Sequence, residues 1–243
     1  MIPTAIREYF CCPTCRGALT WVDDAATCPA CAKRFPIDGT IVDFLETPEL
    51  DPLTNRLESH YNQRAVNNAT PQGEMEVWAL LPAAQVKVAI DVGCGMGNKA
   101  VMLAQKAEWL ICVDLARSSL ELARTQLTQR GLADRTVFIV ANATEMPIRD
   151  GVIDLAVCTE VIEHIEQPAT LVAELHRVVK PDGALVLSAP NYANVAGMIK
   201  RSIDVLLYKG ETRWSPFGVE AFERHITTFA TQRTFHDEGW QID

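Results

Sequence analysis

The chain has 243 residues, of which 48% are hydrophobic and 22% are charged, and its formal net charge is -9. These proportions are ordinary for a globular protein, and the length suffices for one full domain and a small module. The negative charge gives no general attraction to nucleic acid, whose binding depends on Lys and Arg contacts to phosphate. No apolar stretch approaches the roughly 18 residues that span a bilayer, and the first residues lack the apolar core of a signal peptide. We therefore expect a cytoplasmic protein without a membrane span.

Five of the eight cysteines lie within the first 31 residues. Cys12-Pro-Thr-Cys15 and Cys28-Pro-Ala-Cys31 repeat one pattern, with twelve residues between the pairs. Two such pairs bring four thiolates to one tetrahedral metal ion, in a closed site that leaves no position for catalysis. We predict structural zinc held by Cys12, Cys15, Cys28 and Cys31, in a ribbon with a strand over 18–22. Disulfides are the alternative, which a cytoplasmic location disfavours.

The other cysteines are expected to have no role in the metal site. Cys11 competes with Cys12 as a ligand, but only Cys12 gives two matching pairs. Cys94, Cys112 and Cys158 fall in or beside expected strands, so we predict that they are small buried hydrophobic residues.

The segment after the second pair, Lys33-Arg-Phe-Pro-Ile-Asp-Gly-Thr-Ile-Val-Asp-Phe-Leu45, resembles the tail of the small zinc-ribbon activator proteins of tRNA and release-factor methyltransferases. Similar ribbons also precede bacterial methyltransferases, and the resemblance implies a ribbon module over 1–47. Residues 48–82 are rich in Pro, Asn, Gln and Glu and are expected to form a linker and a helical lid. His60-Tyr61-Asn62 resembles the lid of many methyltransferases, and an ordinary amphipathic connector is the other interpretation.

The run Asp91-Val-Gly-Cys-Gly-Met-Gly97 follows an apolar stretch, 86–90, that predicts a buried strand. Glycines at alternate positions let the backbone turn tightly and approach a ligand. A helix is expected from Asn98, and a second short strand, 110–113, ends in Asp114. Together these elements predict a nucleotide-binding half of an α/β sheet, with Asp114 placed for ribose hydroxyls.

The spacing G-x-G-x-G with an acid before it differs from the G-x-G-x-x-G of dinucleotide enzymes. It resembles motif I of the class I S-adenosylmethionine-dependent methyltransferases, and a tight turn in some other α/β protein is the alternative. The resemblance implies S-adenosylmethionine as cofactor, whose cationic tail suits an acid such as Asp91. The cofactor site that it implies consists of Asp91, Gly93, Cys94, Gly95, Gly97, Asp114, Leu115, Asn142, Ala143 and Thr159.

Strands and helices continue to alternate, which predicts a doubly wound, mostly parallel sheet. The resemblance implies that residues 83–243 form the methyltransferase domain. The expected elements are a helix that opens with a capping box at Ser118–Glu121 and continues to Gly131, strands over 137–140 and 152–158, a helix over 168–179, a turn over 180–183 and a strand over 184–189. The family usually finishes with an antiparallel pair after an element that Gly239-Trp240 matches. We therefore expect the C-terminal strand to be missing.

Polar residues follow the third and fourth expected strands, at the edge where ligands bind in such sheets. Asn142-Ala143 stands where the family often has Asp-Ala against adenine, and the Asn carbonyl can accept a hydrogen bond from the adenine amine. Asp154 fits the family's F-D pattern. The segment Thr-Glu-Val-Ile-Glu-His-Ile-Glu over 159–166 resembles the E-V-x-E-H-V segment of ubiquinone-biosynthesis O-methyltransferases.

This segment supplies the candidate catalytic residues. His164 is the candidate base for a hydroxyl acceptor. By resemblance, Glu160, Glu163 and His164 are alternatively ligands of Mg²⁺ or another divalent cation at the acceptor. Packing against the cofactor pocket and capping of a helix end are the other interpretations.

The chain after the fifth expected strand, which includes an insertion before His225, supplies further candidates for the acceptor side. Pro190-Asn191-Tyr192 and His225 resemble acceptor-site elements of the same methyltransferases. Trp214 and Phe217 suit an apolar lid, and a helical cap that packs on the core is the alternative.

The leading hypothesis is a methyltransferase that acts on a hydroxyl or carboxyl of a small molecule. An RNA base methyltransferase that uses the ribbon for recognition is the second. It is disfavoured because residues 1–47 hold four basic and six acidic side chains and because the N-P-P-Y motif is absent. The third hypothesis is a non-catalytic, partner-binding protein, which the intact cofactor loop disfavours.

Overall fold

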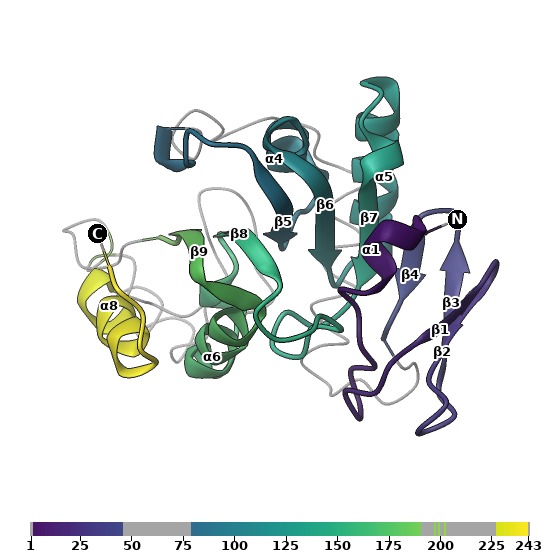
Figure 1. Ribbon diagram of the computed structural model, residues 1–243. Helices are drawn as coiled ribbons and strands as arrows, with labels where there is room; N and C mark the ends of the chain where they lie inside the picture. Colours follow the sequence, from purple (N-terminus) through teal and green to yellow (C-terminus); the bar gives the residue numbers. More distant parts are fainter. Residues whose placement is uncertain are drawn as a thin grey trace.

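The computed structural model describes residues 2–45, 79–190 and 227–242, together with residues 197, 199 and 202. Its centre is a nine-stranded sheet in the order β1-β2-β3-β4-β7-β6-β5-β8-β9 (Figure 1). The strands are β1 (Thr20–Val22), β2 (Ala25–Thr27), β3 (Arg34–Asp38), β4 (Ile41–Asp43), β5 (Val86–Val92), β6 (Ala107–Asp114), β7 (Thr136–Val140), β8 (Ile153–Thr159) and β9 (Val179–Ser188). The helices are α1 (Thr4–Arg7), α4 (Asn98–Lys106), α5 (Arg117–Gln129), α6 (Pro168–Val178) and α8 (Thr228–Asp237), with short 3-10 turns η1 (Ala133–Arg135) and η2 (Ile162–His164).

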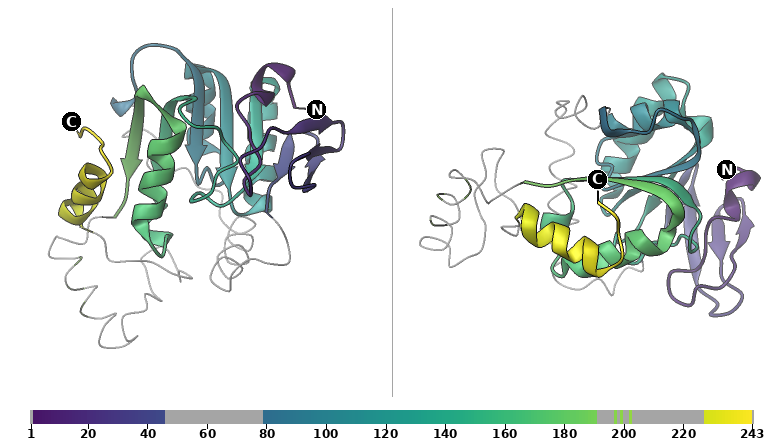
Figure 2. Two further views of the ribbon diagram at one scale, coloured as in Figure 1. Left: turned by 60° about the horizontal axis from the view of Figure 1, so that its bottom comes forward. Right: turned by 60° about the vertical axis from the view of Figure 1, so that its left-hand side comes forward.

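The middle of the sheet is parallel and buried on both faces. β5 pairs in parallel with β6 on one side and with β8 on the other, so the strand order reverses at β5. Its side chains alternate between two cores: Val88 and Ile90 join one cluster, and Ala89 joins the other. Helices α4 and α5 cover one face, whereas α6 and α8 cover the opposite face (Figure 2). This is the doubly wound arrangement that the sequence predicted.

The ribbon continues the same sheet. Strands β1 to β4 are antiparallel to one another, and β4 then pairs in parallel with β7. Phe44 fastens this junction, because its ring lies 6.3 Å from that of Phe10 and 4.9 Å from that of Phe35. The ribbon therefore covers the edge of β7, which would otherwise expose a row of unpaired backbone groups.

Two local expectations are wrong. The helix α5 begins at Arg117, its N-cap is Ala116 without a side-chain cap, and the capping box at Ser118 does not form. Asp114 instead accepts a hydrogen bond from the Ala116 amide (2.8 Å), which fixes the chain just before the helix. The turn over 180–183 lies inside β9, where the register with β8 shifts between Ile153 and Leu155.

The C-terminal part of the described chain carries α8 and no strand after β9. No helix in the described segments has both the length and the apolar character needed to cross a membrane. Most of the expected linker and lid, including His60, Tyr61 and Asn62, lies outside the described residues.

Candidate functional site

The glycine turn joins β5 to α4 at the point where the strand order reverses. The amides of Gly93 and Cys94 both donate to the carbonyl of Val113, at 2.8 and 3.0 Å, so the turn is fastened to β6. Gly93 has a φ of +70°, and a Cβ there would lie 2.3 Å from a methyl carbon of Val161. Gly95 also has a positive φ, +52°, but a Cβ on it would meet no described atom within 4 Å. Gly95 thus leaves open space where a ligand can approach the backbone.

Asp91 lies near the end of β5, directly before this turn, and is 1% exposed. Among the described residues, no donor reaches its buried Oδ2 atom. Burial raises the pKa of this carboxyl to about 7. A buried carboxylate oxygen without a partner is costly, and a cationic ligand group that reaches it would remove that cost.

Asp114 holds the turn from the end of β6. Its Oδ2 accepts a hydrogen bond from the Gly95 amide at 2.8 Å, while Oδ1 accepts the bond from Ala116. Burial raises the pKa of this carboxyl as well. Each carboxylate oxygen has a second lone pair, so these backbone bonds leave acceptor capacity for a hydroxyl.

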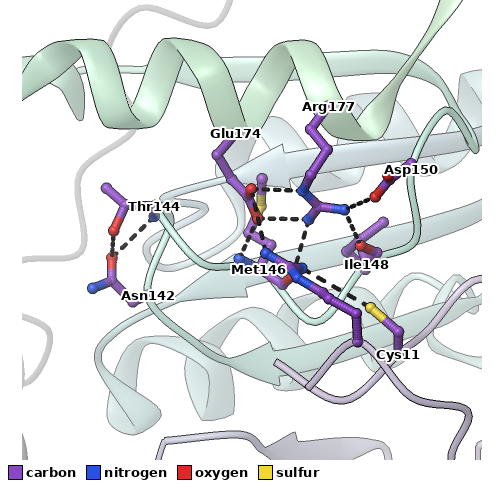
Figure 3. A network of polar contacts seen from close by, with 9 residues as sticks. Cys11, Asn142, Thr144, Met146, Ile148, Asp150, Glu174 and Arg177 are labelled. Carbon is purple, nitrogen blue, oxygen red and sulfur yellow. Dashed lines mark hydrogen bonds and ion pairs between the residues drawn. The ribbon is translucent and has the colours of Figure 1, made fainter. Parts of the chain in front are cut away.

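The loop after β7 carries Asn142 and Ala143. The Asn142 Oδ1 atom accepts hydrogen bonds from the Thr144 amide, at 3.0 Å, and from the Thr144 hydroxyl, at 2.9 Å (Figure 3). The carbonyl oxygen expected to receive the adenine amine is therefore already occupied by two bonds within the loop.

The segment after β8 begins with Thr159, which is 5% exposed. Glu160 has a φ of +56°, an uncommon conformation for a residue with a side chain, and its Oε1 accepts a hydrogen bond from the Ser188 hydroxyl at 2.9 Å. Glu163 is buried, and its Oε1 lies 3.9 Å from Nε2 of His164. The structure thus brings Glu163 and His164 together and places the Glu160 carboxylate on β9 instead.

The cysteine cluster matches the predicted zinc site. The Sγ atoms of Cys12, Cys15, Cys28 and Cys31 all lie within 4.8 Å of one another. Those of Cys12 and Cys31 are 3.5 Å apart, and those of Cys15 and Cys28 are 3.4 Å apart. A Zn–S bond of about 2.3 Å in a tetrahedron sets S–S separations of about 3.8 Å, which lies between these two short pairs and the 4.8 Å limit of the cluster, so the four thiolates suit a tetrahedral ion. Among the described residues, this is the one group of three or more potential metal-ligating side chains that converges in this way.

The two cysteine knuckles share their backbone geometry. Cys12 donates to Gly17 and Cys28 donates to Lys33, at 2.9 and 2.8 Å. The residue after each second cysteine, Arg16 or Ala32, has a left-handed φ of 59° or 60°. The pattern is that of two equivalent loops facing one ion.

The remaining cysteines are buried, as predicted. Cys112 and Cys158 are fully buried and Cys94 is 8% exposed. Burial raises the pKa of Cys112 and of Cys158, so both thiols stay protonated.

Several expected acceptor-side residues lie outside the described residues: Asn191, Tyr192, Trp214, Phe217 and His225. Sequence reasoning also missed Arg16, Glu174 and Arg177, which join the first knuckle to the loop after β7. The bonds that make this connection go to the backbone of Met146, distant in the chain, and the only local signal is the i,i+3 spacing of the Glu174–Arg177 pair.

Comparison with known proteins shows what parts of the chain are similar to. A family model described as a methyltransferase domain matches residues 90–187. The ubiquinone biosynthesis O-methyltransferase of Pseudomonas paraeruginosa is 35% identical over 107 residues, which cover 43% of this chain and 45% of the relative. The corresponding protein of Paracidovorax citrulli is 33% identical over 156 residues, covering 62% of this chain and 63% of the relative. The chain thus spans about half to two thirds of the length of these relatives.

Solved structures agree on the fold. The structure of a candidate methyltransferase from Bacillus halodurans superposes with a TM-score of 0.58 at 21% identity, covering 70% of this chain and 69% of that one. A methyltransferase-domain model thus matches residues 90–187, and the chain shares the fold of the solved structure on which it superposes.

Proposed function

We propose that the protein is an S-adenosylmethionine-dependent methyltransferase that methylates a hydroxyl or carboxyl oxygen of a small molecule. The observation that carries the proposal is the unpartnered, buried Oδ2 of Asp91, near the end of β5 directly before the glycine turn in which Gly95 leaves open space. An acid with a raised pKa at the turning point of an α/β sheet marks a binding site for a cationic group. The O-methyltransferase relatives support an oxygen acceptor.

Three side chains are assigned to the cofactor. Asp91 receives its ammonium group, and Asp114 receives ribose hydroxyls with its remaining lone pairs. The Asn142 oxygen is engaged by Thr144, so the amide NH2 of Asn142 is the group that we assign to an adenine ring nitrogen. The cofactor supplies an electrophilic methyl group on a sulfonium, and the protein has to align an acceptor in line with it.

We assign His164 as the general base that takes the proton from the acceptor. It lies in η2, just past the carboxyl end of β8, and the buried carboxylate of Glu163 lies 3.9 Å from its Nε2 atom. A nearby carboxylate stabilises the imidazolium that forms when histidine accepts a proton. Alignment and exclusion of water supply the rest of the rate enhancement, because methyl transfer is an in-line displacement.

A divalent cation is the weaker explanation for acceptor activation. Glu160 bonds to Ser188, so it would have to leave β9 to join Glu163 and His164 around an ion. The zinc that fits the ribbon has four thiolate ligands and no open coordination position, so we assign it a structural role.

The first experiment measures binding of S-adenosylhomocysteine by calorimetry and transfer of labelled methyl from S-adenosylmethionine. The acceptors are a panel of small phenols and carboxylic acids, with total RNA as a separate arm. Label in the small molecules supports the proposal, whereas label in RNA overturns the substrate class. Absence of cofactor binding overturns the assignment as a methyltransferase.

Two variants test the residue roles. Asp91→Ala should abolish measurable binding, while Asp134→Ala, which removes an exposed acid, should leave it unchanged. His164→Gln should lower kcat by about 100-fold or more at unchanged cofactor affinity, the usual contribution of a general base. A weak chelator that lowers activity of the wild type without removing zinc would instead favour a cation at the acceptor.

A further inference from the structure

The two knuckles of the ribbon differ in what they touch outside the ribbon. Arg16 and Ala32 occupy the same left-handed position, one after Cys15 and the other after Cys31. The metal-binding loop therefore tolerates alanine at this position. The guanidinium of Arg16 is not needed to build the knuckle, so its function has to be sought in its other contacts.

Arg16 reaches the loop that follows β7. Its Nη1 donates a 2.8 Å hydrogen bond to the carbonyl of Met146, 130 positions along the chain. Its Nη2 lies 3.7 Å from Oε2 of Glu174, which is 6% exposed, whereas the Arg16 side chain is 40% exposed. At that exposure solvent weakens the ion pair, so the directional bond to Met146 is the main contact.

Met146 is held from both sides. Its amide donates to Oε1 of Glu174 at 2.6 Å, and its carbonyl also accepts from Nη2 of Arg177 at 3.2 Å. Figure 3 shows Met146 next to Glu174 and the guanidinium of Arg177, with Cys11 of the ribbon close by. Two guanidinium groups and one buried carboxylate thus fix the peptide groups on both sides of Met146, and removing one member leaves the others poorly paired.

Backbone bonds tie the same loop to the chain just before the metal ligands. Cys11 donates to the carbonyl of Pro147 at 3.0 Å, and Arg149 donates to that of Tyr9 at 2.9 Å. Four residues before Met146 is Asn142, and the Glu145 amide closes the intervening turn on the Asn142 carbonyl at 3.1 Å. A shift of Met146 is therefore passed to Asn142 through one tight turn.

We infer that Arg16 is a positioning residue through which the metal-loaded ribbon sets the cofactor loop at Asn142. Folding of the first knuckle around the ion fixes the Arg16 backbone, and its guanidinium then holds Met146 in place. The part of this inference that concerns affinity rests on the proposed function. By thermodynamic reciprocity, a cofactor that binds the ordered loop must also make the ribbon retain its metal more strongly.

The test compares Arg16→Ala with Arg34→Ala, a control that removes another ribbon arginine whose exposed partner is Asp24. Three quantities are measured: zinc per chain, hydrogen exchange of amides over 142–148, and the Kd for S-adenosylhomocysteine. We expect the Arg16→Ala variant to keep one zinc per chain and to exchange its amide hydrogens over 142–148 faster than the wild type. Its affinity for S-adenosylhomocysteine should be about 5-fold or more weaker. Arg34→Ala should match the wild type in all three, and Arg16→Lys should recover part of the loss.

A second readout follows metal release to a chromophoric chelator with and without S-adenosylhomocysteine. The cofactor product should slow release from the wild type and slow it less in Arg16→Ala. Unchanged exchange over 142–148 in Arg16→Ala would overturn the inference, as would zinc loss, which would make Arg16 part of the metal site. An unchanged Kd with faster exchange overturns the link to the cofactor.

The two proposals fail in different ways. If the wild type binds no S-adenosylhomocysteine, the proposed function is overturned. The exchange comparison between Arg16→Ala and Arg34→Ala still decides whether Arg16 holds the loop.

Discussion

In the ribbon, β1, β2 and β4 have three residues each, and β1 is exposed at two of its three positions. In the central sheet, all five residues of β7 and the last five of β5 are buried. The sheet is stabilised by apolar surface removed from water on both faces, whereas the ribbon has too few residues for such a core. The comparison shows why thiolates converge in one region and stay buried and inert in the other.

Loss of the metal should produce the largest difference in stability between the ribbon and the central sheet. Cys28→Ser removes a ligand, and structural zinc contributes apparent binding energies on the order of 10 kcal/mol to small modules. We expect no retained zinc and rapid hydrogen exchange over 12–43, with slow exchange preserved in β5 and β8. The control is Cys112→Ala, which should keep one zinc per chain by mass spectrometry. Slow hydrogen exchange in a ribbon that holds no zinc would show that the ribbon does not depend on its metal for stability.

Glu174→Ala tests the contact that joins the two regions. This buried carboxylate pairs with Arg177 at 2.7 Å and accepts a hydrogen bond from the Met146 amide. Its removal leaves both groups without this partner. Breaking such a pair costs about 3–5 kcal/mol, which urea unfolding measures. Glu121→Ala is the matched control, because its pair with Arg117 is exposed and should contribute about 0.5 kcal/mol or less. Equal losses for the two variants would show that burial does not decide the effect.

The pH dependence of stability should have a component from Asp91 alone. Burial raises the pKa of this carboxyl from 3.8 to about 7 in the folded protein. Between these values the unfolded chain ionises while the folded chain keeps its proton, so folding stability falls as pH rises from about 4 to 7. The full loss approaches about 4 kcal/mol, at 1.36 kcal/mol for each pKa unit.

Asp91→Asn should remove this component, seen as a flatter plot of unfolding free energy against pH in cofactor-free protein. The cofactor's ammonium favours the ionised carboxylate, so the affinity of the wild type should rise with pH below 7, approaching tenfold per unit. A slope of the same size in Asp91→Asn would assign the effect to another group.

Within the sheet, two glycines of one turn should respond differently. Gly93→Ala places a methyl 2.3 Å from Val161 and forces a positive φ, for an expected loss of about 2–4 kcal/mol in urea unfolding. Gly95→Ala meets no neighbour, so only the backbone strain of about 1 kcal/mol remains. For cofactor affinity we expect the opposite order, with the larger loss in Gly95→Ala, because the open side of Gly95 is where we place the ligand.

The smallest effect is expected on the surface of the ribbon. Arg34 and Asp24 form an ion pair at 2.6 Å, but their side chains are 55% and 75% exposed. Arg34→Ala should change stability by less than about 0.5 kcal/mol, and high salt should erase even that difference. A larger loss would show that the ribbon depends on surface pairs as well as on thiolates.

The sequence predicted those parts of the fold that local pattern determines. Apolar runs located β5, β6, β7 and β8 to within a few residues, and the repeated cysteine spacing predicted the cluster that the structure contains. Asp91 was selected beside the glycine turn, although its lack of a donor needed coordinates.

The remainder depends on contacts between distant segments. The pairing of β4 with β7 leaves no trace in either segment alone, because any exposed strand edge can serve as a partner. The capping box failed for a similar reason: Asp114, the last residue of β6, fixes the chain before α5 and leaves Ser118 inside the helix. Glu160 was grouped with His164 by resemblance, yet its carboxylate accepts a hydrogen bond from the Ser188 hydroxyl on the neighbouring strand.

The pairing of β4 with β7 also sets an order of events during synthesis. Ile41 pairs with Phe138, about a hundred residues later, so at about 5–20 residues per second the partner strand follows about 5–20 s behind. All four thiolates have left the ribosome long before then, and the ribbon can take up its ion while β4 still presents an open edge. A nascent chain with that edge exposed is a substrate for mispairing with its neighbours on the same messenger. Scarcity of zinc should therefore lower the yield of this protein through the four cysteines, whereas crowding of ribosomes should lower it through the open edge of β4.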